Sequence, residues 1–243
     1  MLRVRRGPAY MFCGDAMKRR GRLMMQQAPR LIGRRGMLAF GSATFAVSAL
    51  SAKQVYAQVG GGSGPIAPIQ RLNDTLLTVM REGQQTPFTQ RYQQLDPVIG
   101  QTFDLPQVLA ESIGLAWASL PSEQKADLLA AFRRYTVSSY TANFDNYSGQ
   151  RFEISPEPRR LSNGEVIVDT KIISAQGSSN TLDYVMRSAA GAWQVTDVLA
   201  DGSISRVAVQ RSDFSQLLLS GGVPALVAGL RHKVANLSGG MMA

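Results

Sequence analysis

Apolar positions recur three or four residues apart in the first half of the chain that follows Pro68, and this spacing predicts helices. The first helix ends near Gly83 and has one apolar face, formed by Ile69, Leu72, Leu76, Leu77 and Met80. The segment PFTQRYQQLDPVIGQTF predicts a second helix, with a break at Pro97 because proline lacks the amide hydrogen that a helix interior uses.

Two further helices begin at prolines. Pro106 opens PQVLAESIGLAWASL, and Pro121 opens a long helix with Glu123 in its first turn, where an acidic side chain is favourable. Large side chains on the long helix form one stripe: Leu129, Phe132, Thr136, Tyr140, Phe144 and Tyr147. A stripe of this bulk needs a broad apolar surface to pack on.

Four runs of strand-like composition supply that surface: GQRFEISPEP, GEVIVDTKIIS, TLDYVMRSA and AWQVTDVLA, with turn-forming residues between them. Alternation in the second and third runs places these side chains on one face: Val166, Val168, Thr170, Ile172, Leu182, Tyr184 and Met186. The other face carries Glu165, Asp169, Lys171, Asp183 and Arg187. We therefore expect an antiparallel sheet with one apolar and one wet face.

The chain returns to helical spacing in RSDFSQLLLSGGVPALVAGLRHKVANL, where Gly221-Gly222 separates two amphipathic helices. Helices, then strands, then helices indicate an α+β fold, with several helices on one face of a curved antiparallel sheet.

The N-terminal segment has a different character. RRGMLAFGSATFAVSAL combines two arginines and Gly36 with fourteen mostly apolar residues, 37–50, which are too few to cross the roughly 30 Å core of a bilayer. Val55 and Ala57 are the small residues of a cleavage site, so residues 1–57 are predicted to be a signal peptide cut after Ala57. Arg34-Arg35 resembles a twin-arginine export signal. Residues 58–68 form a glycine- and proline-rich linker, 69–237 one domain and 238–243 a flexible tail.

The strongly basic composition belongs to this leader. The chain has 26 Lys and Arg against 17 Asp and Glu, but eleven of the basic residues and one acid precede residue 58. The remainder is close to neutral, which argues against nucleic-acid binding. The single cysteine, Cys13, is also in the leader, so the mature chain has no disulfide and no cysteine metal site.

Candidate catalytic residues are few. His232 lies in a basic RHK context without a carboxylate one helical turn away, so a solvated helix end is the favoured interpretation. Asp197 and Asp201 flank a turn and are expected to shape it. Asp169 and Asp183 fall on the predicted wet face, although small sheet-and-helix cones do host proton-transfer enzymes with a buried aspartate. Metal ligands and other cofactor signals are lacking, and the sequence predicts no enzyme.

The chain from about 70 to 236 resembles the MlaC family, also called the toluene-tolerance Ttg2 auxiliary family, which has a hopanoid-linked HpnM branch. The segments that carry the resemblance include Phe103-Asp104, Gly114 with Trp117, Tyr147 with Gly149-Gln150, Trp193 with Asp197-Val198, and Arg211-Ser212 with Phe214. LPSEQ departs from the family's more frequent Thr-Pro, and Arg206 stands in a stretch that is usually more apolar.

This resemblance implies a periplasmic, monomeric lipid carrier with an NTF2-like cone and a lipid cavity between sheet and helices. Its cargo would be phospholipid or hopanoid, carried between an inner-membrane MCE-domain/ABC transporter complex and an outer-membrane lipoprotein complex without stable membrane insertion. The predicted lipid-binding residues are the helix stripes and apolar strand positions: Leu109, Ile113, Trp117, Leu129, Phe132, Tyr140, Phe144, Tyr147, Val166, Val168, Ile172, Leu182, Tyr184, Met186, Trp193 and Val195.

Two alternatives remain open at this point. An NTF2-like enzyme would place a buried acid toward the cavity, and a non-binding adaptor of an export complex would have a filled core. Periodicity alone does not separate a filled core from a ligand cavity.

Overall fold

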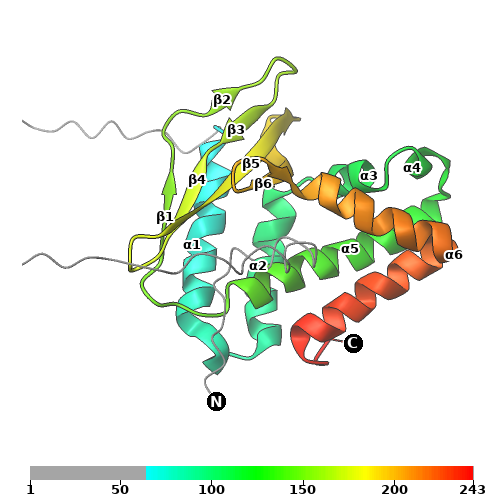
Figure 1. The fold of residues 1–243 in the computed structure, drawn as a ribbon, viewed down its shortest axis with the longest axis horizontal. Coiled ribbons are helices and arrows are strands. Elements are labelled where there is room, and N and C mark those ends of the chain that lie inside the picture. The colour runs from blue at the N-terminus through cyan, green and yellow to red at the C-terminus, as the bar shows by residue number, and fades with distance from the viewer. Residues whose placement is uncertain (1–63, 243) are drawn as a thin grey trace, which may run out of the picture. The chain divides into compact units, whose positions relative to one another are not determined.

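The computed structural model describes residues 64–242; the predicted signal peptide and most of the predicted linker lie outside them. Helices dominate the first half and the C-terminal end of this part of the chain (Figure 1). They are α1 (Ile66–Glu82), a 3₁₀ turn η3 (Gly83–Gln85), α2 (Phe88–Thr102), α3 (Leu105–Ile113), α4 (Ala116–Ser119), α5 (Ser122–Asn143) and α6 (Arg206–Ser238). Helix α1 begins at Ile66, inside the segment 58–68 that we predicted to be linker.

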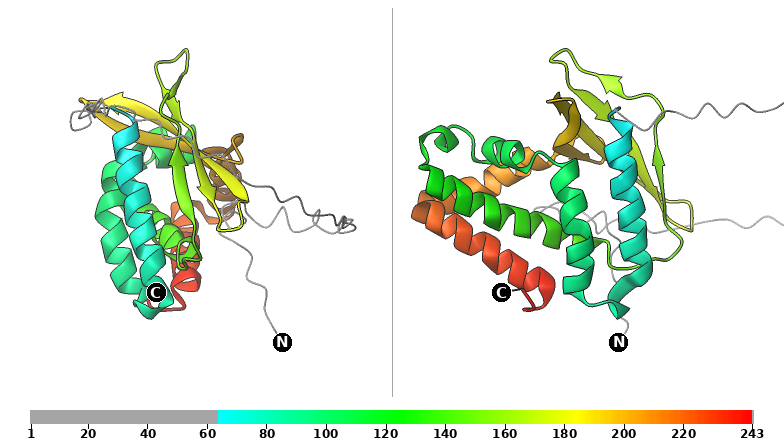
Figure 2. Two further views of the ribbon diagram at one scale, coloured as in Figure 1. Left: turned by 90° about the vertical axis from the view of Figure 1, so that its left-hand side faces the viewer. Right: turned by 180° about the vertical axis from the view of Figure 1, so that it is seen from behind.

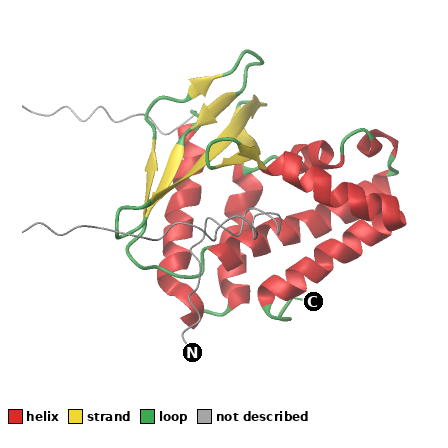
Figure 3. Cartoon of the chain, in the orientation of Figure 1, coloured by secondary structure: helices red, strands yellow, loops and turns green. Residues whose placement is uncertain are grey.

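Seven strands form one antiparallel sheet (Figure 3). They are β1 (Arg151–Ile154), β2 (Arg159–Arg160), β3 (Val166–Val168), β4 (Thr170–Ile173), β5 (Ser179–Ala189), β6 (Ala192–Ala200) and β7 (Ile204–Ser205). The order β1-β4-β5-β3-β2 runs across the sheet, while β6 pairs with β5 and β7 pairs with β6. Helices α1 and α2 lie side by side on one face of this sheet (Figure 2). The prediction of an α+β fold is confirmed.

The predicted strand GEVIVDTKIIS divides at Asp169 into β3 and β4, yet both halves keep the same register with β5. At the bend, side chains replace main-chain hydrogen bonds: the Thr170 amide donates to Asp183 Oδ1 at 3.1 Å, and the Thr170 hydroxyl donates to the Leu182 carbonyl. The Thr170 amide and the Leu182 carbonyl, which would pair with each other in a regular sheet, therefore both keep a hydrogen-bond partner at the bend.

Alternation along β5 places Leu182, Tyr184 and Met186 in the core, as predicted. The opposite face is less wet than expected, because Asp183 is only 3% exposed. Arg159 covers it, with 3.5 Å between Nη2 and Oδ2, and Gly202 approaches from the following turn. A short edge strand and a tight turn thus bury a carboxylate that the sequence pattern assigns to solvent.

Helix α2 continues through Pro97, so the predicted break is wrong. Pro97 and Gln93, whose carbonyl loses its helical donor, are both exposed, and water can satisfy that carbonyl. Leu95 and Ile99 on either side are fully buried and hold the two parts of the helix in line.

Helix α5 ends one turn earlier than its apolar stripe predicts. Asn143 is its last residue, and the Phe144 amide donates to the Tyr140 carbonyl. Tyr147 therefore leaves the stripe: it is 39% exposed, with the Arg81 guanidinium 5.2 Å from its ring centre. Leu128, Phe132, Val137 and Tyr140 form the buried face instead.

Within the described residues, α6 has the length and apolar composition of a membrane-spanning helix. However, Gly221 and Gly222 leave the helical conformation and fold α6 into two halves, as the sequence predicts. Each half has about 15 residues and spans about 23 Å, which is short of a bilayer core. Both halves pack beside α5 (Figures 1 and 2).

Candidate functional site

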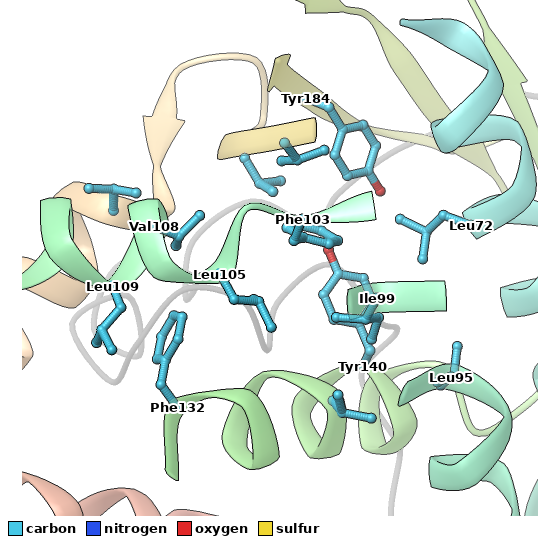
Figure 4. Close-up of a cluster of buried hydrophobic side chains, with 14 of the residues drawn as sticks. Leu72, Leu95, Ile99, Phe103, Leu105, Val108, Leu109, Phe132, Tyr140 and Tyr184 are labelled. Atoms are coloured by element: carbon cyan, nitrogen blue, oxygen red, sulfur yellow. The ribbon is translucent and has the colours of Figure 1, made fainter. Parts of the chain in front are cut away.

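An apolar cavity of about 50 Å³ lies where α3, α5, the start of α6 and the end of β6 meet. Figure 4 shows several of its side chains among the buried core residues. The lining consists of Phe103, Leu105, Val108, Phe132, Tyr135, Thr136, Ser139, Tyr140, Asp197, Val198, Arg206, Val207 and Gln210.

Helix α5 provides one wall through two adjacent rows of side chains. Phe132, Thr136 and Tyr140 are four residues apart, and Tyr135 and Ser139 form the neighbouring row. Phe132 packs edge-on against Phe214 of α6, with ring centres 6.2 Å apart. The first row is therefore fixed by the core, while the second faces the outer end of the cavity.

The facing wall is the contact between α3 and α6, and polar side chains join these two helices. The Ser112 hydroxyl lies 2.9 Å from Gln210 Oε1 and also donates to the Val108 carbonyl. The Arg211 guanidinium donates to the Glu111 carbonyl at 2.6 and 3.0 Å. We call this contact, formed by Glu111, Ser112, Gln210 and Arg211, the α3–α6 seam. These polar contacts add to the apolar packing between the two helices, since Val108 and Leu109 of α3 and Val207 and Phe214 of α6 belong to one buried core.

The inner end of the cavity is aromatic. Phe103 is held against the sheet because the Asp104 amide donates to the Val195 carbonyl at 3.0 Å. Its ring packs edge-on against Tyr140 and Tyr184, with centres 5.7 and 6.4 Å away. Burial raises the pKa of both tyrosines well above the usual value, and the charge of Arg206 partly offsets the rise in the pKa of Tyr140. Both phenols are neutral at ordinary pH.

Asp197 is the one carboxylate in the lining, and its oxygens accept hydrogen bonds from neighbouring parts of the chain. Oδ1 accepts from the amides of Val198 and Val207 at 2.7 and 3.0 Å, and Oδ2 accepts from the Ser205 hydroxyl. The Ser205 hydroxyl in turn accepts from the Ala208 amide and caps α6. Asp197 therefore lies within β6 and stabilises the start of α6, whereas the turn that the sequence assigns to it begins at Asp201.

A second hollow of about 250 Å³ adjoins the cavity and is more polar. It lies between α5 and the two halves of α6, and its lining is Tyr135, Ser139, Asn143, Arg206, Lys233, Asn236 and Leu237. We call it the vestibule. Tyr135, Ser139 and Arg206 line both spaces, so the cavity and the vestibule are direct neighbours.

Of the predicted lipid-binding residues, Phe132 and Tyr140 line the cavity. Most of the others are buried elsewhere in the core: Leu109, Ile113, Phe144, Val166, Val168, Ile172, Leu182, Tyr184, Met186 and Val195. Trp117, Leu129 and Trp193 are partly buried, and Tyr147 is exposed. The cavity thus lies closer to α3 and α6 than the predicted space along the strand faces.

Sequence reasoning missed Leu105, Val108, Val207 and Gln210 as lining residues. They belong to α3 and to the first half of α6, whose approach to α5 depends on tertiary structure. Tyr135 and Ser139 lie one position before stripe residues Thr136 and Tyr140, so a wider stripe on α5 would have included them.

The other candidate acids do not face this cavity. Asp183 is buried on the opposite face of β5 from Tyr184, and Asp169 forms an ion pair with Arg159. His232 is exposed on α6. Among residues 64–242, no cluster of histidine, cysteine or carboxylate side chains could hold a metal ion.

Comparison with known proteins gives one family. The family model described as MlaC protein matches residues 70–232. A solved structure of a phospholipid-binding protein from Ralstonia solanacearum, in complex with a phospholipid, is similar with a TM-score of 0.62. The two sequences are 20% identical, and the match covers 72% of this chain and 98% of the other. No curated protein sequence matches the chain.

Proposed function

The chain belongs to the MlaC protein family, and from this premise we propose that it is a lipid carrier that holds the tail of a phospholipid in the cavity between α3, α5 and α6. The observation that carries the proposal is the apolar cavity with a more polar vestibule directly beside it, across Tyr135, Ser139 and Arg206. An amphiphilic ligand requires this combination of surfaces. The similarity in fold to a protein solved with a phospholipid supports the same conclusion.

We further propose the cellular role that the sequence predicts. After removal of residues 1–57 the protein would work in the periplasm, receiving lipid from or delivering it to an inner-membrane MCE-domain/ABC transporter and an outer-membrane lipoprotein complex. Binding and release suffice for this role, so no catalytic group is needed.

The size of the cavity sets a condition on this function. A space of about 50 Å³ holds only a few water molecules, so an acyl chain enters only when the walls separate. Burial of a chain of about 16 carbons would contribute on the order of 13 kcal/mol. Such cargo leaves slowly by itself, and a partner protein that opens the carrier would speed its release.

Lipid extraction and native mass spectrometry of the protein purified from its own periplasm test the proposal. We expect a complex with the mass of a bound diacyl lipid. The variant Val108→Phe adds volume to the cavity wall and should reduce occupancy at least several-fold, with a stability loss of about 1–3 kcal/mol.

Val227→Phe is the matched control, because Val227 is equally buried but lies outside the lining. It should cost similar stability and keep the bound lipid. Wild-type protein without lipid under gentle conditions would contradict the carrier and favour a non-binding adaptor. Equal occupancy in both variants would place the lipid elsewhere.

A further inference from the structure

The vestibule carries two positive charges. Arg206 is the first residue of α6 and Lys233 lies in its second half, and the fold of α6 at Gly221 and Gly222 brings both to the same hollow beside α5. The remaining lining residues are Tyr135, Ser139, Asn143, Asn236 and Leu237. The described lining of the vestibule therefore contains cations and hydrogen-bonding groups but no acid.

Arg206 lies at the boundary between the two spaces, because it also lines the apolar cavity. Lys233 sits further out, with Nζ 5.5 Å from the centre of the Tyr135 ring. Lys233 also pairs with Asp213 at 3.5 Å, but both side chains are more than a third exposed, so this ion pair contributes little. The two cations thus mark a path from the end of the cavity outward.

Two polar atoms along this path lack a hydrogen-bond partner among the described residues. The Thr136 hydroxyl is buried in the cavity wall, and the Asn143 amide oxygen is buried in the vestibule wall. Buried polar groups are normally satisfied. The Thr136 hydroxyl can donate to an ester oxygen between the tails and the headgroup of a lipid, and the Asn143 amide oxygen can accept from a headgroup hydroxyl.

We propose that the vestibule is a headgroup subsite for a lipid with net negative charge, in which Arg206 binds the phosphate and the positive charge of Lys233 favours an uncharged outer group over an ammonium group. This inference rests on the proposed function and adds the class of cargo to it. With the tail in the cavity, the phosphate lies at Arg206 and an outer uncharged group at Lys233. A headgroup with its own ammonium group meets two cations there and is disfavoured. The subsite therefore selects phosphatidylglycerol over phosphatidylethanolamine.

Competition between these two lipids tests the subsite. The delipidated protein is incubated with vesicles of equal phosphatidylglycerol and phosphatidylethanolamine content, and the bound lipid is identified by native mass spectrometry. Because each exposed ion pair is worth a factor of roughly two to five, we expect on the order of fivefold enrichment of phosphatidylglycerol. The enrichment should fall as salt is raised.

The lipid bound by the double variant Arg206→Gln/Lys233→Gln should lose the enrichment and follow the vesicle ratio, whereas Arg206→Lys should retain the enrichment. Arg231→Gln removes one charge from the same half of α6 at an exposed position outside the vestibule, so it should behave as wild type. A parallel incubation with inorganic phosphate separates a lipid headgroup from a free anion as the ligand. Millimolar phosphate should leave the lipid ratio unchanged.

Three results would overturn the subsite and leave the carrier function standing. If wild-type protein binds the two lipids in the same ratio as the vesicles contain them, the two cations do not select between the headgroups. If the double variant retains the enrichment, other residues are responsible for the selection. Loss of the phosphatidylglycerol enrichment in the presence of millimolar phosphate would show that the vestibule binds free anions and not specifically a lipid headgroup. Wild-type protein without any bound lipid would overturn the carrier function itself, and the subsite with it.

Discussion

Asp183 shows how one residue can depart from the pattern of its strand. It is buried beneath Arg159 on the face of β5 that the sequence assigns to solvent. Burial is the largest effect on its carboxyl and raises the pKa, while the hydrogen bond from the Thr170 amide opposes the rise. Between the unfolded pKa of about 3.9 and the higher folded pKa, the folded protein binds the extra proton.

The stability contributed by the Asp183 proton is therefore present at low pH and is lost as pH rises through the folded pKa. Asp183→Asn retains an oxygen that can accept from Thr170 but does not titrate. We expect the stability of the wild type, measured relative to this variant by urea unfolding, to decrease as pH rises above about 4. A constant difference between pH 4 and 7 would contradict a raised pKa.

At the scale of elements, the bend in α6 depends on Gly222. Its φ of 64° and ψ of −156° lie in a region that residues with a side chain rarely adopt. Gly222→Ala should therefore lower the free energy of unfolding by about 1–3 kcal/mol in chemical denaturation. Gly64→Ala is a suitable control, because an added Cβ there has no heavy atom within 4 Å. Equal effects of the two substitutions would mean that the bend tolerates alanine.

Sequence patterns predicted these elements well where burial alternates regularly. The burial of Leu182, Tyr184 and Met186 on one face of β5 follows from the alternation of apolar and polar residues along the strand. The division of α6 into two halves follows from the paired glycines Gly221 and Gly222. The break at Pro97 and the place of Tyr147 in the α5 stripe were wrong, because solvent access and helix-end geometry decide them. Neither quantity can be read from apolar spacing.

The cavity was harder to predict than the fold for a related reason. Most of the predicted lipid-binding residues fill the core, while Phe132 and Tyr140 reach the cavity. A filled core and a lined cavity have the same apolar periodicity. The difference arises where α3, α5 and α6 meet, and residues about 100 positions apart, such as Ser112 and Gln210, form that contact.

For the whole molecule, the small cavity and the large cargo require a conformational change. The α3–α6 seam borders the cavity, whereas none of the described lining residues belongs to α1 or α2. We therefore expect loading to separate α3 from α6 and to leave α1 and α2 in place.

Spin labels measure this separation in a chain with Cys13 replaced by serine. One pair is Ala110→Cys with Ser212→Cys across the seam, and the reference pair is Thr78→Cys with Gln93→Cys between α1 and α2. Loading with phosphatidylglycerol should lengthen the first distance by on the order of 4 Å, the contact distance between carbon atoms, because a chain must fit between the walls. The reference distance should stay constant. If lipid binds and neither distance changes, the cargo enters without opening the seam, and the cavity between α3, α5 and α6 is not its site.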